Sequence, residues 1–300
     1  MTKPYDNPRI KLKERADAKQ GVVHWSKEKS LWFTTMLVVF LVAAPLTVSV
    51  GSVLIFIVFT SFILCFGHSL GMHRLFIHQS YSCPKVLEYF LVHLGVLVGL
   101  AGPFGMLRTH DLRDWAQRQN KCHDYFGHQQ HIVIDGVWQI LCDLKLSHPP
   151  IVNIESKYMN DPVYQWMEKY WMFQQLPWAI IFFILGGLPW VVWGICGRVV
   201  VSILGHWLVG FFAHNKGSQH YHIKGAAIQG YNISGLSLLT MGECWHNNHH
   251  AFPSSAKFGL YETEWDPGWW ILKGMKKLGL VDDLKVPSTL PKRSDLFHIH

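Results

Sequence analysis

Residues 31–72 read LWFTTMLVVFLVAAPLTVSVGSVLIFIVFTSFILCFGHSLGM and contain no Asp, Glu, Lys or Arg. An α-helix rises 1.5 Å per residue, so these 42 residues would extend about 63 Å as one helix. The hydrocarbon core of a bilayer is about 30 Å thick, so the run is long enough for two crossings and too long for one. Pro45 and Gly51 lie near its middle, where a tight turn would join two helices. The stretch therefore predicts a transmembrane hairpin.

A second apolar pair follows in the later half of the chain. Residues 170–197 and 199–213 are free of Asp, Glu, Lys and Arg, and Arg198 divides them. Of the 300 residues, 49% are hydrophobic and only 16% are charged, as is typical of a membrane protein. We predict an all-α, multi-pass integral membrane protein. Its four transmembrane helices would form two hairpins, at about residues 31–47, 51–70, 171–191 and 197–213.

Basic residues predict the orientation. The first 30 residues hold eight Lys or Arg, whereas the turn near Pro45 holds none and the second turn holds only Arg198. Because basic flanks favour the cytoplasmic side, we expect a cytoplasmic basic N-terminal segment (1–30) and a cytoplasmic polar C-terminal tail (284–300). The excess of 27 basic over 20 acidic residues could instead indicate a nucleic-acid partner. Membrane topology explains that excess more simply, and we expect no nucleic acid.

Two histidine clusters stand out among the 19 histidines. The late cluster is HNNHH at 246–250, and its histidines at i, i+3 and i+4 would share one face of a helix. The early cluster is HRLFIH, with His73 and His78 at its ends. Converging imidazoles bind zinc, copper, iron or nickel, so the clusters predict a metal site without choosing the metal. The alternative is a partly protonated surface patch.

The apolar stretch 86–106 is interrupted by Glu88, His93 and a Gly-Pro-Phe-Gly turn at 102–105. If it crossed the membrane, the early and late histidine clusters would lie on opposite sides and could not share a metal centre. We therefore expect an interfacial or re-entrant helix here.

The flanks of both clusters resemble the integral-membrane fatty acid desaturase family, in particular its acyl-CoA (stearoyl-CoA delta-9) branch. That branch carries HRLWSHRSY and GEGWHNYHHTFP, and this chain reads HRLFIHQSY and GECWHNNHHAFP. The match runs over about residues 31–283, which we take as the desaturase domain. The resemblance implies a cytoplasmic helical cap that carries a histidine-rich diiron site.

The second histidine box of that family is altered here. The family has WxRDHRxHH, and aligning residues 108–110 with its RDH gives HDLRD, with Arg113 and Asp114 in place of two histidines. His110 is retained, and Asp114 could still bind iron through its carboxylate. Arg113 stays protonated and cannot be a ligand. We expect it to pair with Asp114 or Asp111, or to contact the anionic head of a ligand.

Residues 207–214, WLVGFFAH, resemble the family's WLVNSxxH, whose histidine is a ligand and whose asparagine supports a metal-bound water. His214 carries over as a ligand, whereas Gly210 replaces the asparagine. His206 could compensate in part, or it could simply be a packed membrane-helix histidine. His123, His128 or His131 could replace the lost second-box nitrogen, or all three could lie in a hydrated loop.

The resemblance implies two non-haem irons, with O2 as co-substrate. The predicted ligands are His73, His78, His110, Asp114, His214, His246, His249 and His250. The predicted supporting or substitute residues are Arg113, His128, His131, His206 and Glu243. Glu243, Asp111 and Asp124 are acidic groups that could orient the imidazole ligands.

These observations predict an oxygen-dependent fatty acyl desaturase of the bacterial inner membrane or endoplasmic reticulum, with a cytoplasmic active site. Its substrate would be an acyl-lipid, acyl-CoA or acyl-carrier protein, and membrane lipid would surround it. A separate ferredoxin or cytochrome b5-type donor would supply electrons. Two alternatives remain open: a lipid or fatty acyl hydroxylase on the same scaffold, and a non-catalytic relative that kept the fold and lost an iron.

Overall fold

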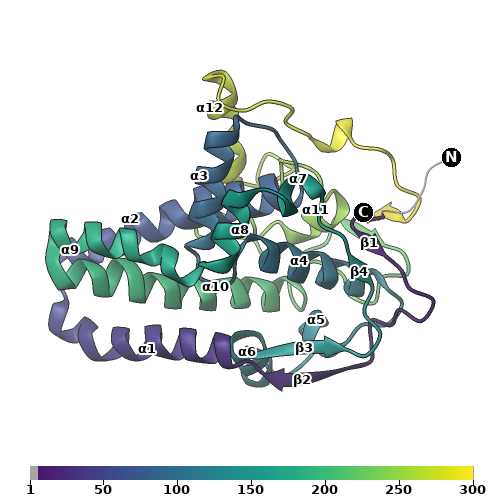
Figure 1. Cartoon of the computed structure of the whole chain (residues 1–300). Helices are drawn as coiled ribbons and strands as arrows, with labels where there is room; N and C mark the ends of the chain where they lie inside the picture. The colour runs from purple at the N-terminus through teal and green to yellow at the C-terminus, as the bar shows by residue number, and fades with distance from the viewer. Residues whose placement is uncertain (1–5, 300) are drawn as a thin grey trace.

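The computed structural model describes residues 6–299, so residues 1–5 of the predicted N-terminal segment and residue 300 of the predicted tail lie outside it. Long helices run side by side toward one end of the molecule, and the shorter elements gather at the other end (Figure 1). The helices are α1 Lys27–Thr47, α2 Val50–Phe62, η1 Ile63–Ile77, α3 Lys85–Val96, α4 Pro103–Arg118, α5 Asp124–Gly127, α6 Ile132–Leu141, α7 Ser156–Met159, α8 Pro162–Lys169, η2 Met172–Gln174, α9 Gln175–Val191, η3 Val192–Gly197, α10 Arg198–Ala213, α11 His246–Ala251, α12 Pro267–Lys277 and η4 Pro287–Thr289.

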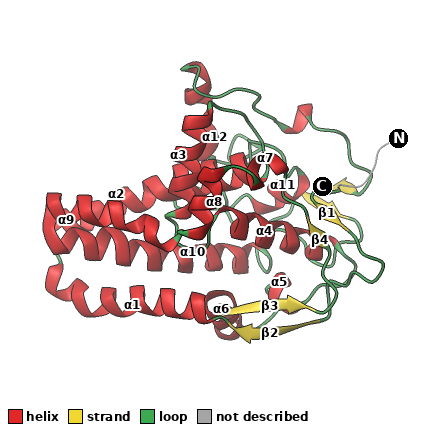
Figure 2. Ribbon diagram, viewed as in Figure 1, coloured by secondary structure: helices red, strands yellow, loops and turns green. Residues whose placement is uncertain are grey.

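The helix-rich class expected from the sequence is confirmed, with a small β component that the sequence analysis did not predict. Within residues 6–299 there are three two-stranded antiparallel ribbons, β1–β4, β2–β3 and β5–β6 (Figure 2). Their strands are β1 Ile10–Lys11, β2 Gly21–Trp25, β3 Cys142–Leu146, β4 Ile151–Val152, β5 Tyr221–Ile223 and β6 Leu296–His298. Two of these ribbons hold the N-terminal segment against the middle of the chain.

Three helical segments of the described chain are long and apolar enough to cross a membrane: Lys27–Thr47, Val50–Ile77 and Met172–Ala213. Most of their residues are not buried by the protein itself. Apolar side chains that remain exposed over such lengths match the hydrocarbon of a bilayer. The prediction of a membrane protein is therefore supported by both length and composition.

The segment Met172–Ala213 contains a sharp turn. At Gly187 the backbone leaves the helix with φ 64° and ψ −161°. Phe182, which precedes this turn, packs against Gly194 and Ile195, which follow it. An unbroken helix would place residues 182 and 194 about 18 Å apart. The segment therefore folds back on itself, and α9 and α10 lie side by side (Figure 1).

Arg198 does not lie in that turn, contrary to the expectation from the sequence. It begins α10, is fully buried and donates hydrogen bonds to the Leu97 carbonyl and the Gln175 side chain. The turn itself, at Gly187, holds no basic residue.

The stretch 86–106 does not form one continuous helix. Helix α3 ends at Val96, the chain turns at Gly99 with φ 90°, and α4 begins at Pro103. Helix α3 has 12 residues and is about 18 Å long, shorter than the roughly 30 Å core of a bilayer. It packs tightly on η1 at Gly67. A Cβ at that glycine would lie only 2.4 Å from the Leu94 carbonyl group.

Candidate metal centre

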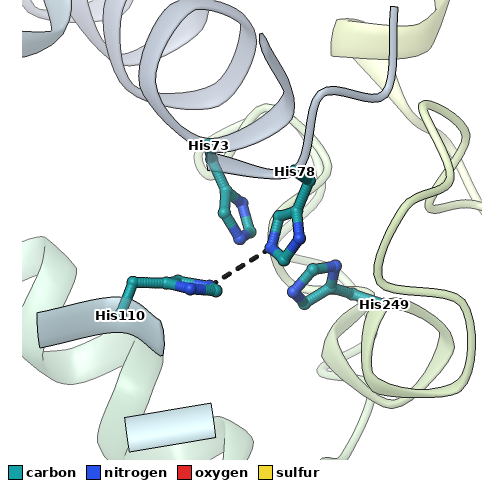
Figure 3. Close-up of side chains that lie close together, drawn as sticks. All are labelled: His73, His78, His110 and His249. Atoms are coloured by element: carbon teal, nitrogen blue, oxygen red, sulfur yellow. Dashed lines mark hydrogen bonds between the residues drawn. The ribbon is translucent and has the colours of Figure 1, made fainter. Parts of the chain in front are cut away.

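Four histidines from three separate parts of the chain converge on one point (Figure 3). His73, His78, His110 and His249 each offer a ring nitrogen, and these nitrogens all lie within 4.8 Å of one another. The Nε2 atoms of His78 and His110 are 3.2 Å apart. We call this set the first group.

Three further histidines form a second group beside the first. His214, His246 and His250 also bring their ring nitrogens within 4.8 Å of one another. The Nε2 of His246 lies 3.2 Å from that of His214 and 2.9 Å from that of His250. The structure thus brings together all seven histidines predicted as ligands, although in two groups.

The spacing of these nitrogens fits metal ligation. Two imidazole nitrogens about 2.1 Å from one ion, at a right angle to each other, are about 3.0 Å apart. The observed separations of 2.9 and 3.2 Å agree with this value.

The protonation state of the rings also fits. Burial lowers the pKa of His246 to about 3, and burial together with repulsion from neighbouring rings lowers the pKa of His78, His214, His249 and His250 well below the usual value. Neutral imidazoles keep the lone pair that a metal needs.

A π-helix positions the first histidine box, which is the early cluster at residues 73–78. Residues five apart on an α-helix lie about 140° apart around its axis, which would separate His73 from His78. Helix η1 is a π-helix, whose turns close between residues i and i+5, and the His78 N–H donates to the His73 carbonyl at 3.0 Å. The same spacing brings His68 onto this face, with its ring 6.3 Å from that of His73. The regular series 68, 73, 78 was the signal that sequence analysis missed.

The third histidine box, which is the late cluster at residues 246–250, divides between the two groups. Helix α11 directs His249 into the first group and His246 and His250 into the second. The ring centroids of the three histidines lie within 5.8 Å of one another, as the shared face predicted, and their nitrogens serve two groups. The short helix is held by Asn232, which accepts from the Asn247 N–H, and by Arg293, which donates to the carbonyls of His250 and Ala251.

Acceptors orient three of the ligands. Glu243 lies 2.6 Å from Nδ1 of His73, Asp111 lies 3.3 Å from Nδ1 of His110, and the Gly210 carbonyl lies 2.7 Å from Nδ1 of His214. A partner on Nδ1 leaves Nε2 free to face a metal. The role considered for Asp124 is wrong, because that carboxylate accepts from Lys19 and Gln130 instead.

The altered second box has other partners than expected. Asp114 lies outside both histidine groups, although it lines a cavity that opens onto them. Both of its oxygens lie 3.0 Å from Nε of Arg118. Arg113 pairs with neither Asp114 nor Asp111. Its guanidinium contacts Nε2 of His128 at 3.0 Å and the Gln139 side chain at 2.6 Å.

The candidate substitute ligands lie at different distances from the metal groups. His128 stacks 5.4 Å from His214, but Arg113 and Asp135 engage its two ring nitrogens. It fills the space left by Gly210, where a Cβ would lie 3.1 Å from its Nε2. His131 is exposed at the start of α6 and is not brought to the centre.

A cavity opens onto both groups. Its polar wall includes His68, His206 and Thr109, and the rings of His68 and His206 are 5.1 Å apart. The sequence analysis singled out neither Thr109 nor His68 as a site residue. The apolar lining includes Met72, Ile77, Met106 and Val209. The arrangement can place an apolar group beside two adjacent metal-binding groups.

Comparison with known proteins identifies the family of this chain. No family model matches the chain. It is 34% identical to the sn-1 stearoyl-lipid 9-desaturase of Anabaena variabilis over 73% of this chain and 79% of that protein. It is 30% identical to the acyl-CoA C20 Delta5-desaturase of Anemone leveillei over 85% and 80% of the two chains, and 31% identical to the sn-2 palmitoyl-lipid 9-desaturase of Nostoc over 75% and 78%. The chain therefore belongs to the fatty acid desaturase family.

Proposed function

We propose that this protein is an oxygen-dependent membrane fatty acyl desaturase in which each histidine group holds one iron. The observation that carries the proposal is the adjacency of the two groups. His249 of the first group and His250 of the second are consecutive residues, and their ring centroids are 5.8 Å apart. Relatives named as acyl-lipid and acyl-CoA desaturases support the same reaction class.

The ligand set would be the seven grouped histidines, with Asp114 as a proposed eighth ligand beside the second group. Iron, when bound, supplies the oxidising power to remove hydrogen from an unactivated methylene with O2, which no side chain can provide. The overall reaction converts –CH2–CH2– with O2, two electrons and two protons into –CH=CH– and two molecules of water. Because iron(II) ligation needs neutral imidazoles, the buried and neutral rings suit this site.

The remaining residues of the site would bind and orient. Met72, Ile77 and Val209 line the cavity with apolar atoms and suit a methylene chain. Glu243 would hold the His73 ring in the tautomer that presents Nε2. The lined cavity would also keep bulk water from the reacting carbons.

The topology we propose has four crossings, because the 42-residue segment folds back at Gly187. The cap that carries the histidines would face the cytoplasm of a bacterium or the cytoplasmic side of the endoplasmic reticulum. Electrons would come from a separate ferredoxin or cytochrome b5-type protein. The substrate would be an acyl chain on a lipid, on CoA or on acyl-carrier protein.

One test is expression in a host that lacks unsaturated fatty acids, followed by lipid profiling and iron analysis of the purified protein. We expect about two irons per chain and products that are two hydrogens lighter than the saturated acyl chain. His249→Ala should lower the iron content and abolish the product, whereas His298→Ala, on a ribbon strand outside the two groups, should change neither. Zinc alone, or no metal, in folded protein from iron-replete cells would overturn the proposal.

The same profile tests the hydroxylase alternative, which rests on the replacements at Arg113, Asp114 and Gly210. A product that gains one oxygen, instead of losing two hydrogens, would replace desaturation with hydroxylation. Folded protein with fewer than two irons and no altered lipid would indicate a non-catalytic relative.

A further inference from the structure

Arg9 is buried in the centre of the protein, although the sequence places it among the basic residues of a solvated N-terminal segment. Its residue exposure is only 7%. Strand β1, which follows Arg9, pairs with β4 and so holds the N-terminal segment against residues 151–152. Burying a guanidinium is costly unless every donor finds an acceptor. The contacts of this side chain therefore indicate what it does there.

The guanidinium of Arg9 contacts three different segments. Nη2 donates to the Ile77 carbonyl at 2.7 Å, Nη1 donates to Oδ2 of Asp111 at 3.1 Å, and Nε contacts both oxygens of Glu155 at 2.9 and 3.0 Å. The planar guanidinium, with its fixed N–H donors, can donate to all three acceptors at once, and a lysine ammonium cannot.

Two of these acceptors adjoin metal ligands of the first group. Ile77 directly precedes His78, and Asp111 directly follows His110. Asp111 also faces the His110 ring through its other oxygen, Oδ1, at 3.3 Å from Nδ1. The Nε2 atoms of His78 and His110 face each other at 3.2 Å. One side chain thus connects the backbone of one ligand with the carboxylate that orients the other.

We propose that Arg9 is a positioning residue for the first metal group, which makes the N-terminal segment part of the metal centre. Without Arg9, the buried Asp111 carboxylate would lose its cationic partner and would be free to turn from His110. The end of η1 would lose a donor at the turn that sets the angle of His78. The inference rests on the proposed function, because it needs the first group to hold a metal.

The test compares Arg9→Met and Arg9→Lys with Lys11→Met and Lys13→Met. The two lysines are exposed and lie on the same segment, so their variants remove equal charge without touching the centre. Each full-length protein is purified in detergent, and iron is titrated away with a chelator while the thermal unfolding temperature is recorded. Loss of a group that orients a ligand typically weakens metal binding about 10- to 100-fold. We expect that loss for one of the two irons in Arg9→Met.

Arg9→Lys keeps the charge but not the fork, so it should restore the unfolding temperature without fully restoring iron affinity. Mössbauer spectra should show one altered iron environment and one that matches the control. Adding Asp111→Asn to Arg9→Met should weaken iron binding little more than the stronger of the two single changes, because both act through the same contact.

Three outcomes are decisive. Equal iron affinity in Arg9→Met and the lysine controls would overturn the inference. Equal loss of both irons, in step with the unfolding temperature in both Arg9 variants, would also overturn it, because it would indicate a purely structural role. Wild-type protein that binds no iron would instead overturn the proposed function, and the control variants would show the same absence.

Discussion

Glu243 connects the third histidine box with the first. It lies three residues before His246 in sequence, yet its carboxylate lies 2.6 Å from Nδ1 of His73 in the first box and accepts from Ser69 at 2.5 Å. Burial raises the pKa of this carboxyl, but the facing His73 ring and Arg74 outweigh burial and hold it at about 2. The ionised carboxylate can accept a hydrogen bond from Nδ1–H of a neutral His73 ring.

Glu243→Gln should weaken iron binding about 10- to 100-fold, because the amide cannot stabilise the His73 ring as the carboxylate does. Chelator titration of the purified protein measures the change. Glu262→Gln, at an exposed position of the same cap, is the matched control. Unchanged iron affinity in Glu243→Gln would mean that His73 is held by its helix alone.

Asp114 can act on iron directly or through Arg118, whose Nη2 also donates to the His250 carbonyl at 3.1 Å. If Asp114 is a ligand, Asp114→Ala should lower iron content and remove activity, and Asp114→His should retain more iron than the alanine variant. Arg118→Met, which frees the carboxylate, should then keep its iron. Similar partial iron loss in Asp114→Ala and Arg118→Met would show that Asp114 acts by holding Arg118. Metal analysis of the three variants separates these cases.

At the scale of elements, the wide π-helix η1 and the close approach of α3 shape the centre together. The π-helical turn carries His68, His73 and His78 on one face, and Gly67 allows α3 to approach another face of the same helix. Overpacking at this contact would push α3 away from the helix that carries the ligands.

Gly67→Ala should destabilise the protein by about 1–3 kcal/mol, because the new methyl group would meet the Leu94 backbone, which cannot rotate away. Gly274→Ala on α12 is the control, since its Cβ would meet nothing within 4 Å. That substitution should stabilise by up to about 1 kcal/mol through helix propensity. Thermal unfolding in detergent compares the two, and equal unfolding temperatures would contradict the tight packing of α3 on η1.

At the scale of the whole molecule, both ends of the described chain reach the metal centre. Arg9 contacts the first group through Ile77 and Asp111, and Arg293 donates to the carbonyl of His250 in the second. We therefore expect both termini to lie on the same side of the membrane as the histidines. This agrees with an even number of crossings.

Topology reporters can test that arrangement. Fusions at Lys19, Leu146 and Pro287 should report the cytoplasmic side, and fusions at Val48 and Leu188 should report the opposite side. Val48 and Leu188 lie at the two helical turns, and neither turn has a basic residue. A non-cytoplasmic signal at Leu146 would mean that residues 86–106 cross the membrane and would exclude the shared centre.

The sequence by itself determined the membrane class, the family and the seven histidines that form the two groups. The length of an uncharged, apolar segment such as residues 31–72 is a local property, which does not depend on the rest of the chain. The motif flanks at 73–81 and 242–253 are likewise local. Each could be read without knowing how the chain folds.

Only the tertiary structure decided how those residues combine. The division of the third box between two groups, the partners of Arg113 and the burial of Arg9 all depend on contacts between segments far apart in sequence. Arg9 and Lys11 carry the same charge on the same segment, and no local pattern distinguishes the buried one from the exposed one. The difference arises because only the folded chain brings Asp111, Glu155 and the Ile77 carbonyl to one guanidinium, which offsets the cost of burying it.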